Sequence, residues 1–154
     1  MFSRESICLN EFLKEFHQQN RPDLELSGIH FTLTLPPQNL FVQGNKERMR
    51  IALENLCFNA LSFTPEDGNI DLSLALEDGY ALVAVRDTGA GIDPQVLPRI
   101  FDRGFTQRPD NSGEGLGLYL VRAITLEHGG TVSVSSELGK GSVFTLRLPV
   151  VKQS

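Results

Sequence analysis

The sequence lacks three features that would place it at once in a broad class of protein. No apolar run approaches the roughly 20 residues that a membrane-spanning helix needs, and the first residues do not have the charged-then-apolar layout of a secretory signal. Basic residues are not in excess, because the formal net charge is -5. A nucleic-acid binder usually carries a basic stripe. We therefore expect a soluble domain with no nucleic acid as its principal partner.

Cysteine is scarce as well. The chain has two, Cys8 and Cys57, which are too few and too far apart for a metal cluster. Cys57 lies within the apolar stretch Leu56–Phe58, where we expect a buried, reduced thiol. A reducing cytoplasm fits this pattern.

The patterns that are present predict one domain covering residues 1–154, long enough to bury a single substantial core. Apolar residues at helical spacing predict helices near 9–17, 45–63 and 116–124. Alternating or continuous apolar runs predict strands at 30–35, 70–76, 80–85, 131–135 and 142–148. Pro22 is expected to break the first helix, and Asn45 is expected to cap the second. The order of elements predicts an α/β fold, a two-layer sandwich.

Two asparagines are the first candidate functional residues. Asn55 and Asn59 are four residues apart, so they project from one side of the predicted helix, at the margin of its apolar stripe. Their carbonyl oxygens suit a hard cation such as Mg²⁺. The alternative is a pair of polar residues at the edge of a buried face, and for the pair taken alone this alternative is favoured.

A second candidate segment, residues 87–92, directly follows an apolar strand. The Asp87 carboxylate is able to accept hydrogen bonds from an exocyclic amine, and Gly89 and Gly91 let the backbone approach a flat ring. Asp and Gly also dominate ordinary turns. A ligand site and a plain turn are about equally supported by this segment alone.

A third candidate is the glycine-rich segment 113–118, which opens a predicted helix. Free N–H groups at a helix start form a seat for phosphate oxygens. No strand directly precedes the segment, so a nicotinamide dinucleotide site is not expected. Phosphate binding of another kind is favoured over a flexible helix cap.

Between these segments lies a long connection that contains Phe101, Arg103, Phe105 and Arg108. Such a long connection without regular structure usually has a function. The two phenylalanines are expected to anchor a mobile loop, from which an arginine reaches toward a polyphosphate. The alternative is a solvated surface loop, and each arginine taken singly favours it.

The histidines suggest no catalytic group. His17, His30 and His128 have no acidic neighbour placed to make them nucleophilic. His128 ends a predicted helix, where a cation suits the helix dipole. No Ser-His-Asp or Cys-His arrangement follows from the spacing.

Five motifs in a fixed order resemble the N, G1, F, G2 and G3 boxes of the catalytic domain of sensor histidine kinases. They are Asn55-Leu-Cys-Phe-Asn59-Ala60, Asp87-x-Gly89-x-Gly91, Phe101 to Phe105, Gly113-x-Gly115-x-Gly117 and Gly139-x-Gly141. The likeness covers about residues 9–149. It implies a Bergerat-type ATP-binding fold, in which a mixed, mostly antiparallel sheet packs on about three helices beside a mobile ATP lid at about 93–113.

The resemblance also implies roles for residues. Asp87 would bind the adenine amino group with Gly91 and Thr145 nearby, and Asn59 would ligate Mg²⁺ with Asn55 beside it. The residues expected at the cofactor are Asn55, Asn59, Asp87, Gly89, Gly91, Ile92, Phe101, Phe105, Gly113, Gly115, Leu116, Gly117, Leu118 and Thr145. The residues expected to act in catalysis are Asn55, Asn59, Arg103 and Arg108.

Asn55 helps to choose within the superfamily. ATPases that share this pattern place a glutamate there as general base, and an amide cannot accept a proton at neutral pH. Glu54 is adjacent, but one residue turns it about 100° away. Histidine phosphorylation is therefore favoured. Ser62 and Gln107 depart from the family, which often has a lysine and an arginine at these positions.

The resemblance implies transfer of the ATP γ-phosphoryl group, with Mg²⁺, to a histidine on a separate dimerisation domain, for onward transfer to a response regulator. The helix that carries this histidine in the family is not found in the sequence. We expect a monomeric cytoplasmic domain, attached to a membrane only through upstream sequence. A lid-driven ATPase and a non-catalytic nucleotide-binding module are the alternatives.

Overall fold

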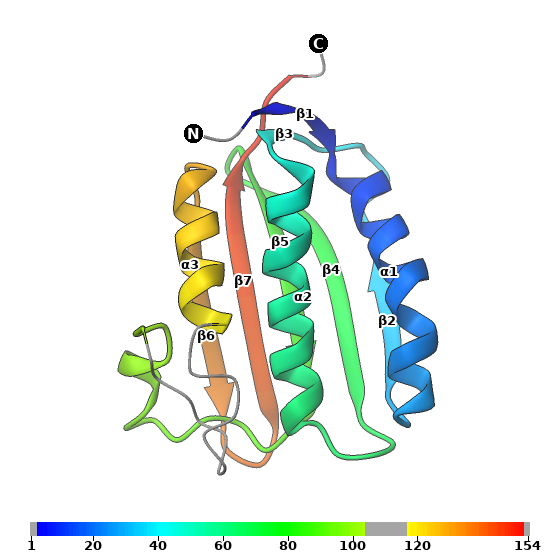
Figure 1. Cartoon of the computed structure of the whole chain (residues 1–154), viewed down its shortest axis with the longest axis vertical. Helices are drawn as coiled ribbons and strands as arrows, with labels where there is room; N and C mark the ends of the chain where they lie inside the picture. The colour runs from blue at the N-terminus through cyan, green and yellow to red at the C-terminus, as the bar shows by residue number, and fades with distance from the viewer. Residues whose placement is uncertain (1–2, 104–116, 153–154) are drawn as a thin grey trace.

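The computed structural model of the chain describes residues 3–103 and 117–152. Within these ranges, three helices and a short 3-10 turn accompany seven strands: α1 (Leu9–Leu26), α2 (Lys46–Phe63), η1 (Leu97–Arg99), α3 (Gly117–Glu127), β1 (Glu5–Cys8), β2 (His30–Thr34), β3 (Phe41–Gly44), β4 (Asn69–Glu77), β5 (Tyr80–Asp87), β6 (Thr131–Glu137) and β7 (Gly141–Pro149). The helices α1, α2 and α3 lie side by side over one face of the main sheet (Figure 1). The two-layer α/β sandwich is confirmed.

The main sheet has the strand order β2-β4-β5-β7-β6. Its β2–β4 pair is parallel, and the other three pairs are antiparallel, as predicted for a mixed sheet. Alternate residues of the central strands, such as Leu72 and Val83, are fully buried under the helices. The register places Asp87, the last residue of β5, opposite Ser142 of β7. One end of the sheet thus holds both residues.

The start of α2 agrees with the sequence. Asn45 caps the helix, since its Oδ1 accepts a hydrogen bond from the Arg48 N–H at 3.0 Å. Cys57 is buried on the inner face of this helix. Burial, with a smaller contribution from the charge of Glu54, raises the pKa of the Cys57 thiol to about 12. The expectation of a buried, reduced thiol is confirmed, and this thiol is inert.

The interpretation of His128 as a cation at a helix end is wrong. The imidazole is 5% exposed, its Nδ1 lies 2.8 Å from the Ile124 carbonyl oxygen, and its Nε2 lies 3.1 Å from the Asn45 backbone N. A carbonyl only accepts and an amide N–H only donates, so Nδ1 carries the hydrogen and Nε2 accepts. His128 is therefore neutral, and it joins the end of α3 to the cap of α2.

The expected break of the first helix at Pro22 is also wrong. Helix α1 continues through Pro22 to Leu26. The proline removes one backbone hydrogen bond within the helix, but Leu24 beyond it is buried in the core, and the Ile29 N–H donates to the Leu24 carbonyl oxygen at 3.0 Å. Packing of one apolar side chain past the proline keeps the last turn helical.

Strand β1 was not expected. Its four residues pair antiparallel with β3, from Glu5 opposite Gly44 to Cys8 opposite Phe41. Four residues are too few for a clear alternating pattern, and the strand exists only because a segment about 35 residues later pairs with it.

None of the helices in the described part of the chain is both long and apolar enough to cross a membrane.

Candidate functional site

A small cavity lies where the end of α2 meets the ends of β5 and β7. Its lining residues are Asn59, Phe63, Asp87, Gly91, Ile92 and Ser142. The N-box asparagine and the strand-end carboxylate, 28 positions apart in sequence, therefore line one cavity. The two residues that the family resemblance assigns to adenine and to Mg²⁺ thus line the same cavity.

Asp87 forms one wall of this cavity and is only 6% exposed. Its carboxylate accepts a hydrogen bond from the Gly89 N–H at 2.9 Å. Burial raises the pKa of Asp87 above its ordinary value, while backbone hydrogen bonding, chiefly from Gly89, works in the opposite direction. The lone pairs that the backbone leaves unused are available to a donor in the cavity.

Two glycines shape the loop that follows Asp87. Gly91 has a φ of +81°, in the left-handed region, and a Cβ there would collide with the Glu137 carbonyl oxygen. A Cβ at Gly89 would collide with the Phe63 carbonyl oxygen at the end of α2. These positions pack the loop against both neighbouring segments. Because neither position has room for a Cβ, glycine is required at both, independently of any ligand in the cavity.

Asn55 and Asn59 are both half-buried at the margin of the apolar stripe of α2, as predicted. Their side chains, however, line different cavities. Asn59 lines the Asp87 cavity. Asn55 instead lines a cavity between α1 and α2, and its Nδ2 donates to the Ile51 carbonyl oxygen at 2.8 Å. Its Oδ1 faces α3, since a Cβ added at Gly117 would lie 3.0 Å from it.

The expectation that Thr145 lies near Asp87 is wrong. Asp87 pairs with Ser142, and Thr145 pairs with Ala84. Successive side chains of a strand point to opposite faces of the sheet, so Thr145, three residues after Ser142, points away from the helices. Ser142 takes the place that was assigned to Thr145, and Phe63 also lines the cavity without having been expected there.

The described part of the expected lid packs onto the core. Phe101 stacks edge-to-face on Phe144, with ring centroids 6.0 Å apart. Arg103 is exposed, and its guanidinium lies 5.9 Å from the centre of the Tyr119 ring in α3. Residues 97–99 form η1. Ile92 is buried beside them.

Some of the residues expected at the phosphates and in the lid lie within the part of the chain that the structure describes, and others do not. Gly117 opens α3, and Leu118 has its side chain in the core. The other positions, Phe105, Arg108, Gly113, Gly115 and Leu116, lie outside the described residues.

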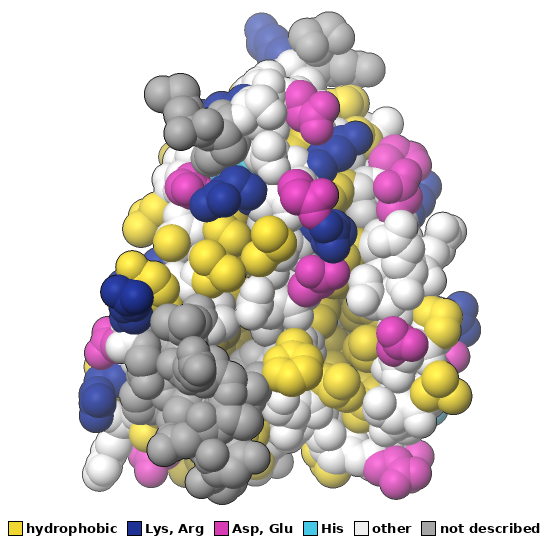
Figure 2. All heavy atoms as spheres, viewed as in Figure 1, with side chains coloured by type: hydrophobic (Ala, Val, Ile, Leu, Met, Phe, Trp, Pro, Cys, Tyr) yellow, Lys and Arg dark blue, Asp and Glu magenta, His cyan; other side chains and the backbone are white. Residues whose placement is uncertain are grey.

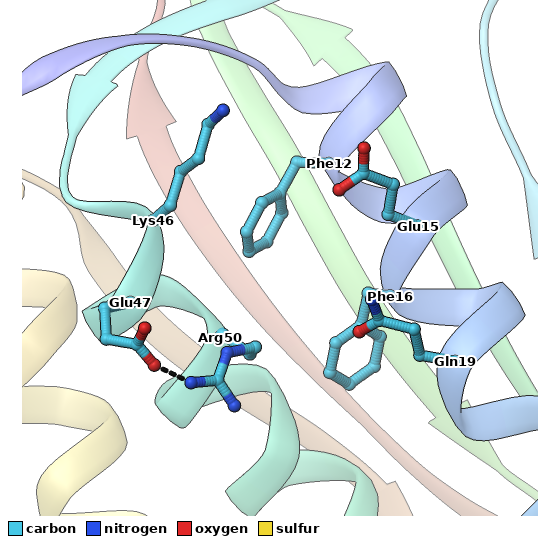
Figure 3. A pocket seen from close by; sticks show the side chains of 7 residues that line it. All are labelled: Phe12, Glu15, Phe16, Gln19, Lys46, Glu47 and Arg50. Carbon is cyan, nitrogen blue, oxygen red and sulfur yellow. Dashed lines mark ion pairs between the residues drawn. The ribbon is translucent and has the colours of Figure 1, made fainter.

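A further cavity, beside the start of α2, is lined by residues of α1 and α2 and does not include Asp87. Figure 3 shows Phe12 and Phe16 of α1 facing Lys46, Glu47 and Arg50 of α2. Glu47 and Arg50 form an ion pair with each other. In Figure 2, acidic and basic side chains intermingle over the upper part of this helical face. This cavity contains none of the residues predicted to bind a ligand, so we place the candidate site at Asp87.

The chain matches known proteins along most of its length. Residues 44–152 match the family described as "Histidine kinase-, DNA gyrase B-, and HSP90-like ATPase". The sensor histidine kinase RppB of Synechocystis is 33% identical over 147 residues, covering 93% of this chain and 32% of that protein. The sensor protein DivL of Caulobacter vibrioides is 36% identical over 149 residues, covering 97% of this chain and 19% of that protein. The chain thus spans about a fifth to a third of these relatives.

Solved structures show the same fold. The catalytic domain of histidine kinase ThkA superposes with a TM-score of 0.85 at 28% identity, covering 96% of this chain and 98% of that one. Full-length ShkA, solved in complex with AMPPNP, gives a TM-score of 0.87 at 28% identity, covering all of this chain and 32% of that one. By fold and by sequence, the chain belongs to the histidine kinase-, DNA gyrase B- and HSP90-like ATPase family, on its sensor histidine kinase side.

Proposed function

We propose that the chain binds ATP with Mg²⁺ and transfers the γ-phosphoryl group to a histidine on a separate dimerisation domain. The observation that carries this proposal is the single cavity that Asp87 and Asn59 share. Relatives that are sensor histidine kinases, and a ShkA structure solved with an ATP analogue, support it.

In this proposal the exocyclic amine of adenine reaches the Asp87 end of this small cavity, and the ring lies at its mouth. The carboxylate accepts a hydrogen bond from the exocyclic amine, and Ser142, rather than Thr145, is the neighbouring hydroxyl. Gly91 and Ile92 border the ring. A charged acceptor makes such a bond worth about 1.5–3 kcal/mol, which is enough to select the base.

Mg²⁺ would be held by Asn59 together with the phosphate oxygens of the nucleotide. In residues 3–103 and 117–152, no group of three or more His, Cys, Asp or Glu side chains could hold a metal by itself. One amide oxygen suits a hard cation that keeps most of its ligands from phosphate and water. We therefore expect the metal to arrive with the nucleotide, where it would neutralise phosphate charge.

The phosphates would lie toward the start of α3. Backbone N–H groups of Gly117 and Leu118 stand in its first turn, where free N–H groups and the helix dipole favour an anion. Gly113, Gly115 and Leu116 complete this proposed seat. Positioning and charge neutralisation are what phosphoryl transfer requires of a protein.

Asn55 favours a histidine as the acceptor. Its amide cannot take a proton from water or a hydroxyl, and its Nδ2 is already bonded to the helix backbone. An imidazole nitrogen attacks the γ-phosphorus with its own lone pair, the bond to the bridging oxygen breaks, and ADP leaves. Arg103 or Arg108 of the proposed lid would stabilise the transferring charge.

The wider role follows from this chemistry. The phosphohistidine would pass its phosphoryl group to a response regulator, and the domain would act in the cytoplasm as a monomer until it meets the histidine-bearing domain. The proposed lid covers about residues 93–113.

The test uses radiolabelled ATP with Mg²⁺ and a histidine-bearing helical fragment from a close relative's dimerisation domain. We expect label on the fragment, little phosphate release by the chain alone, and no label when the fragment's histidine is replaced by alanine. Rapid phosphate release without any fragment would favour the ATPase alternative and contradict the proposal. Absence of nucleotide binding would contradict both.

A further inference from the structure

Ser136, the sixth residue of β6, joins three segments around the Asp87 cavity. Its Oγ lies 2.7 Å from the backbone N of Ile92, 3.1 Å from the carbonyl oxygen of Gly141 and 3.0 Å from the Oγ of Ser142. Ile92 and Ser142 line the cavity, whereas Ser136 does not. Ser136 therefore stands one hydrogen bond behind the cavity wall.

One assignment of the two hydroxyl hydrogens satisfies all three contacts. A hydroxyl donates one hydrogen bond and accepts two. The Ile92 N–H only donates, so Ser136 accepts there, and the Gly141 carbonyl only accepts, so Ser136 donates there. Either hydroxyl could be the donor in the third contact, and the assignment that makes all three contacts hydrogen bonds at once has Ser142 donate to Ser136. The reverse assignment would leave two acceptors, Ser136 Oγ and the Gly141 oxygen, facing each other at 3.1 Å.

The consequence concerns what Ser142 offers to a ligand. With its hydrogen directed at Ser136, the Ser142 hydroxyl has only lone pairs left for the cavity. Its backbone N–H belongs to the β5–β7 ladder, in which Ser142 pairs with Asp87. The Asp87 carboxylate is itself an acceptor. The Asp87–Ser142 side of the cavity thus presents oxygen lone pairs. Such a wall matches an amino group and repels a carbonyl oxygen.

We propose that Ser136 is a positioning residue that sets purine specificity, because it holds Ser142 as an acceptor and so favours an amino-purine over an oxo-purine. This inference rests on the proposed binding of ATP at Asp87. Ser136 touches no ligand in this account. It acts through Ser142, and it also ties the Ile92 loop to the β6–β7 hairpin.

The experiment compares the affinities of ATP and inosine triphosphate by calorimetry. In the wild type we expect a clear preference for ATP. In Ser136→Ala the Ser142 hydroxyl is released and can turn its hydrogen toward a purine oxygen, so the ATP-to-inosine preference should fall roughly threefold to tenfold, the size of one neutral hydrogen bond. A purely structural role would weaken both nucleotides equally and leave the ratio unchanged, which would overturn the proposal.

Three further variants complete the test. Ser135→Ala, at the exposed neighbouring position on the same strand, should leave the ratio unchanged. Ser142→Ala should lower the ratio even if Ser136→Ala fails to fold, and adding Ser136→Ala to it should change the ratio no further. If the ATP-to-inosine triphosphate affinity ratio of Ser142→Ala equals that of the wild type, the proposed action of Ser136 through Ser142 is overturned. Failure of the wild type to bind either nucleotide would instead overturn the proposed function.

Discussion

The two ends of α2 illustrate how one helix serves both stability and binding. At its start, polar groups are matched within the protein: Asn45 caps the helix, His128 accepts from the Asn45 N–H, and Arg48 forms a two-pronged ion pair with Glu127 at 2.7 and 2.8 Å. At its far end, Asn59 faces a cavity shared with Asp87. The polar groups at the first end are hydrogen-bonded within the protein, and the other end borders the cavity that we propose as the nucleotide site.

The difference predicts that substitutions at the two ends separate stability from affinity. Changes at the start of α2 should unfold the protein at lower temperature while the folded fraction still binds nucleotide normally. Changes at the cavity should weaken nucleotide binding and leave the melting temperature nearly unchanged. Each prediction below tests one side of this separation.

The largest effect is expected for His128→Ala. The change opens space among buried residues and leaves the Asn45 N–H without its acceptor, while the Ile124 carbonyl keeps only the backbone N–H of residue 128. The free energy of unfolding should therefore fall by about 2–4 kcal/mol. Urea unfolding measures it. His30→Ala, at an exposed strand position, is the matched control and should cost little. A loss of ATP affinity in folded His128→Ala would contradict the separation.

Asp87→Asn should have the next largest effect, now on affinity. Removing the charged acceptor should weaken ATP binding roughly 10- to 100-fold, since a hydrogen bond to a charged group is worth about 1.5–3 kcal/mol. The melting temperature should be unchanged or higher, because a buried carboxylate is lost. Calorimetry measures the affinity. Asp78→Asn, in the exposed turn at the other end of β5, is the control. Equal affinity in Asp87→Asn and the wild type would refute the assigned adenine contact.

Asn59→Ala should weaken ATP binding about tenfold in the presence of Mg²⁺ and much less when the metal is chelated, because its proposed role is to ligate the cation. The readout is the difference between titrations with and without Mg²⁺. Asn69→Ala, at an exposed position outside the cavity, provides the control. If the loss were the same with and without Mg²⁺, Asn59 would not be the metal ligand.

The smallest effect is a pH dependence. Because burial raises the pKa of Asp87 in the folded state, this group binds a proton more readily when folded. Its neutral form contributes stability at low pH that is lost as the pH rises from the unfolded value through the raised folded value. ATP affinity should change in the opposite direction, decreasing on acidification at a pH above the ordinary carboxyl value of 3.8.

The matched comparison for this pH dependence is Asp87→Asn, in which both the stability slope and the affinity slope should flatten in that range. Slopes equal to those of the wild type would show that another group titrates.

Local patterns were enough to predict much of this arrangement. The cap at Asn45, the placement of Asn59 at the margin of a helical stripe and the position of Asp87 at a strand end all follow from residues within a few positions of one another. These signals depend on helix and strand periods, which any segment carries in its own sequence. The two-layer α/β arrangement could therefore be predicted before any contact was known, whereas the family's fold was implied by the resemblance of the five motifs.

The remaining features depend on which segments meet. The β5–β7 register decides whether Ser142 or Thr145 lies beside Asp87. Because the two residues are three positions apart, their side chains point to opposite faces of the sheet. The neutral state of His128 depends on Asn45, distant in sequence. Strand β1 exists only as the partner of β3. Such choices are made by long-range pairing, which a single sequence does not display.

The central claim is that nucleotide and metal occupy the Asp87–Asn59 end of α2. Nuclear magnetic resonance with ATP and Mn²⁺ in place of Mg²⁺ tests it directly, because the paramagnetic ion broadens signals of nearby nuclei. We predict the strongest broadening at Asn59 and weaker broadening at Asp87. We predict none at Asn45, or at Phe16 in the cavity beside the start of α2. Strongest broadening at Phe16 or Asn45, with Asn59 sharp, would contradict the account.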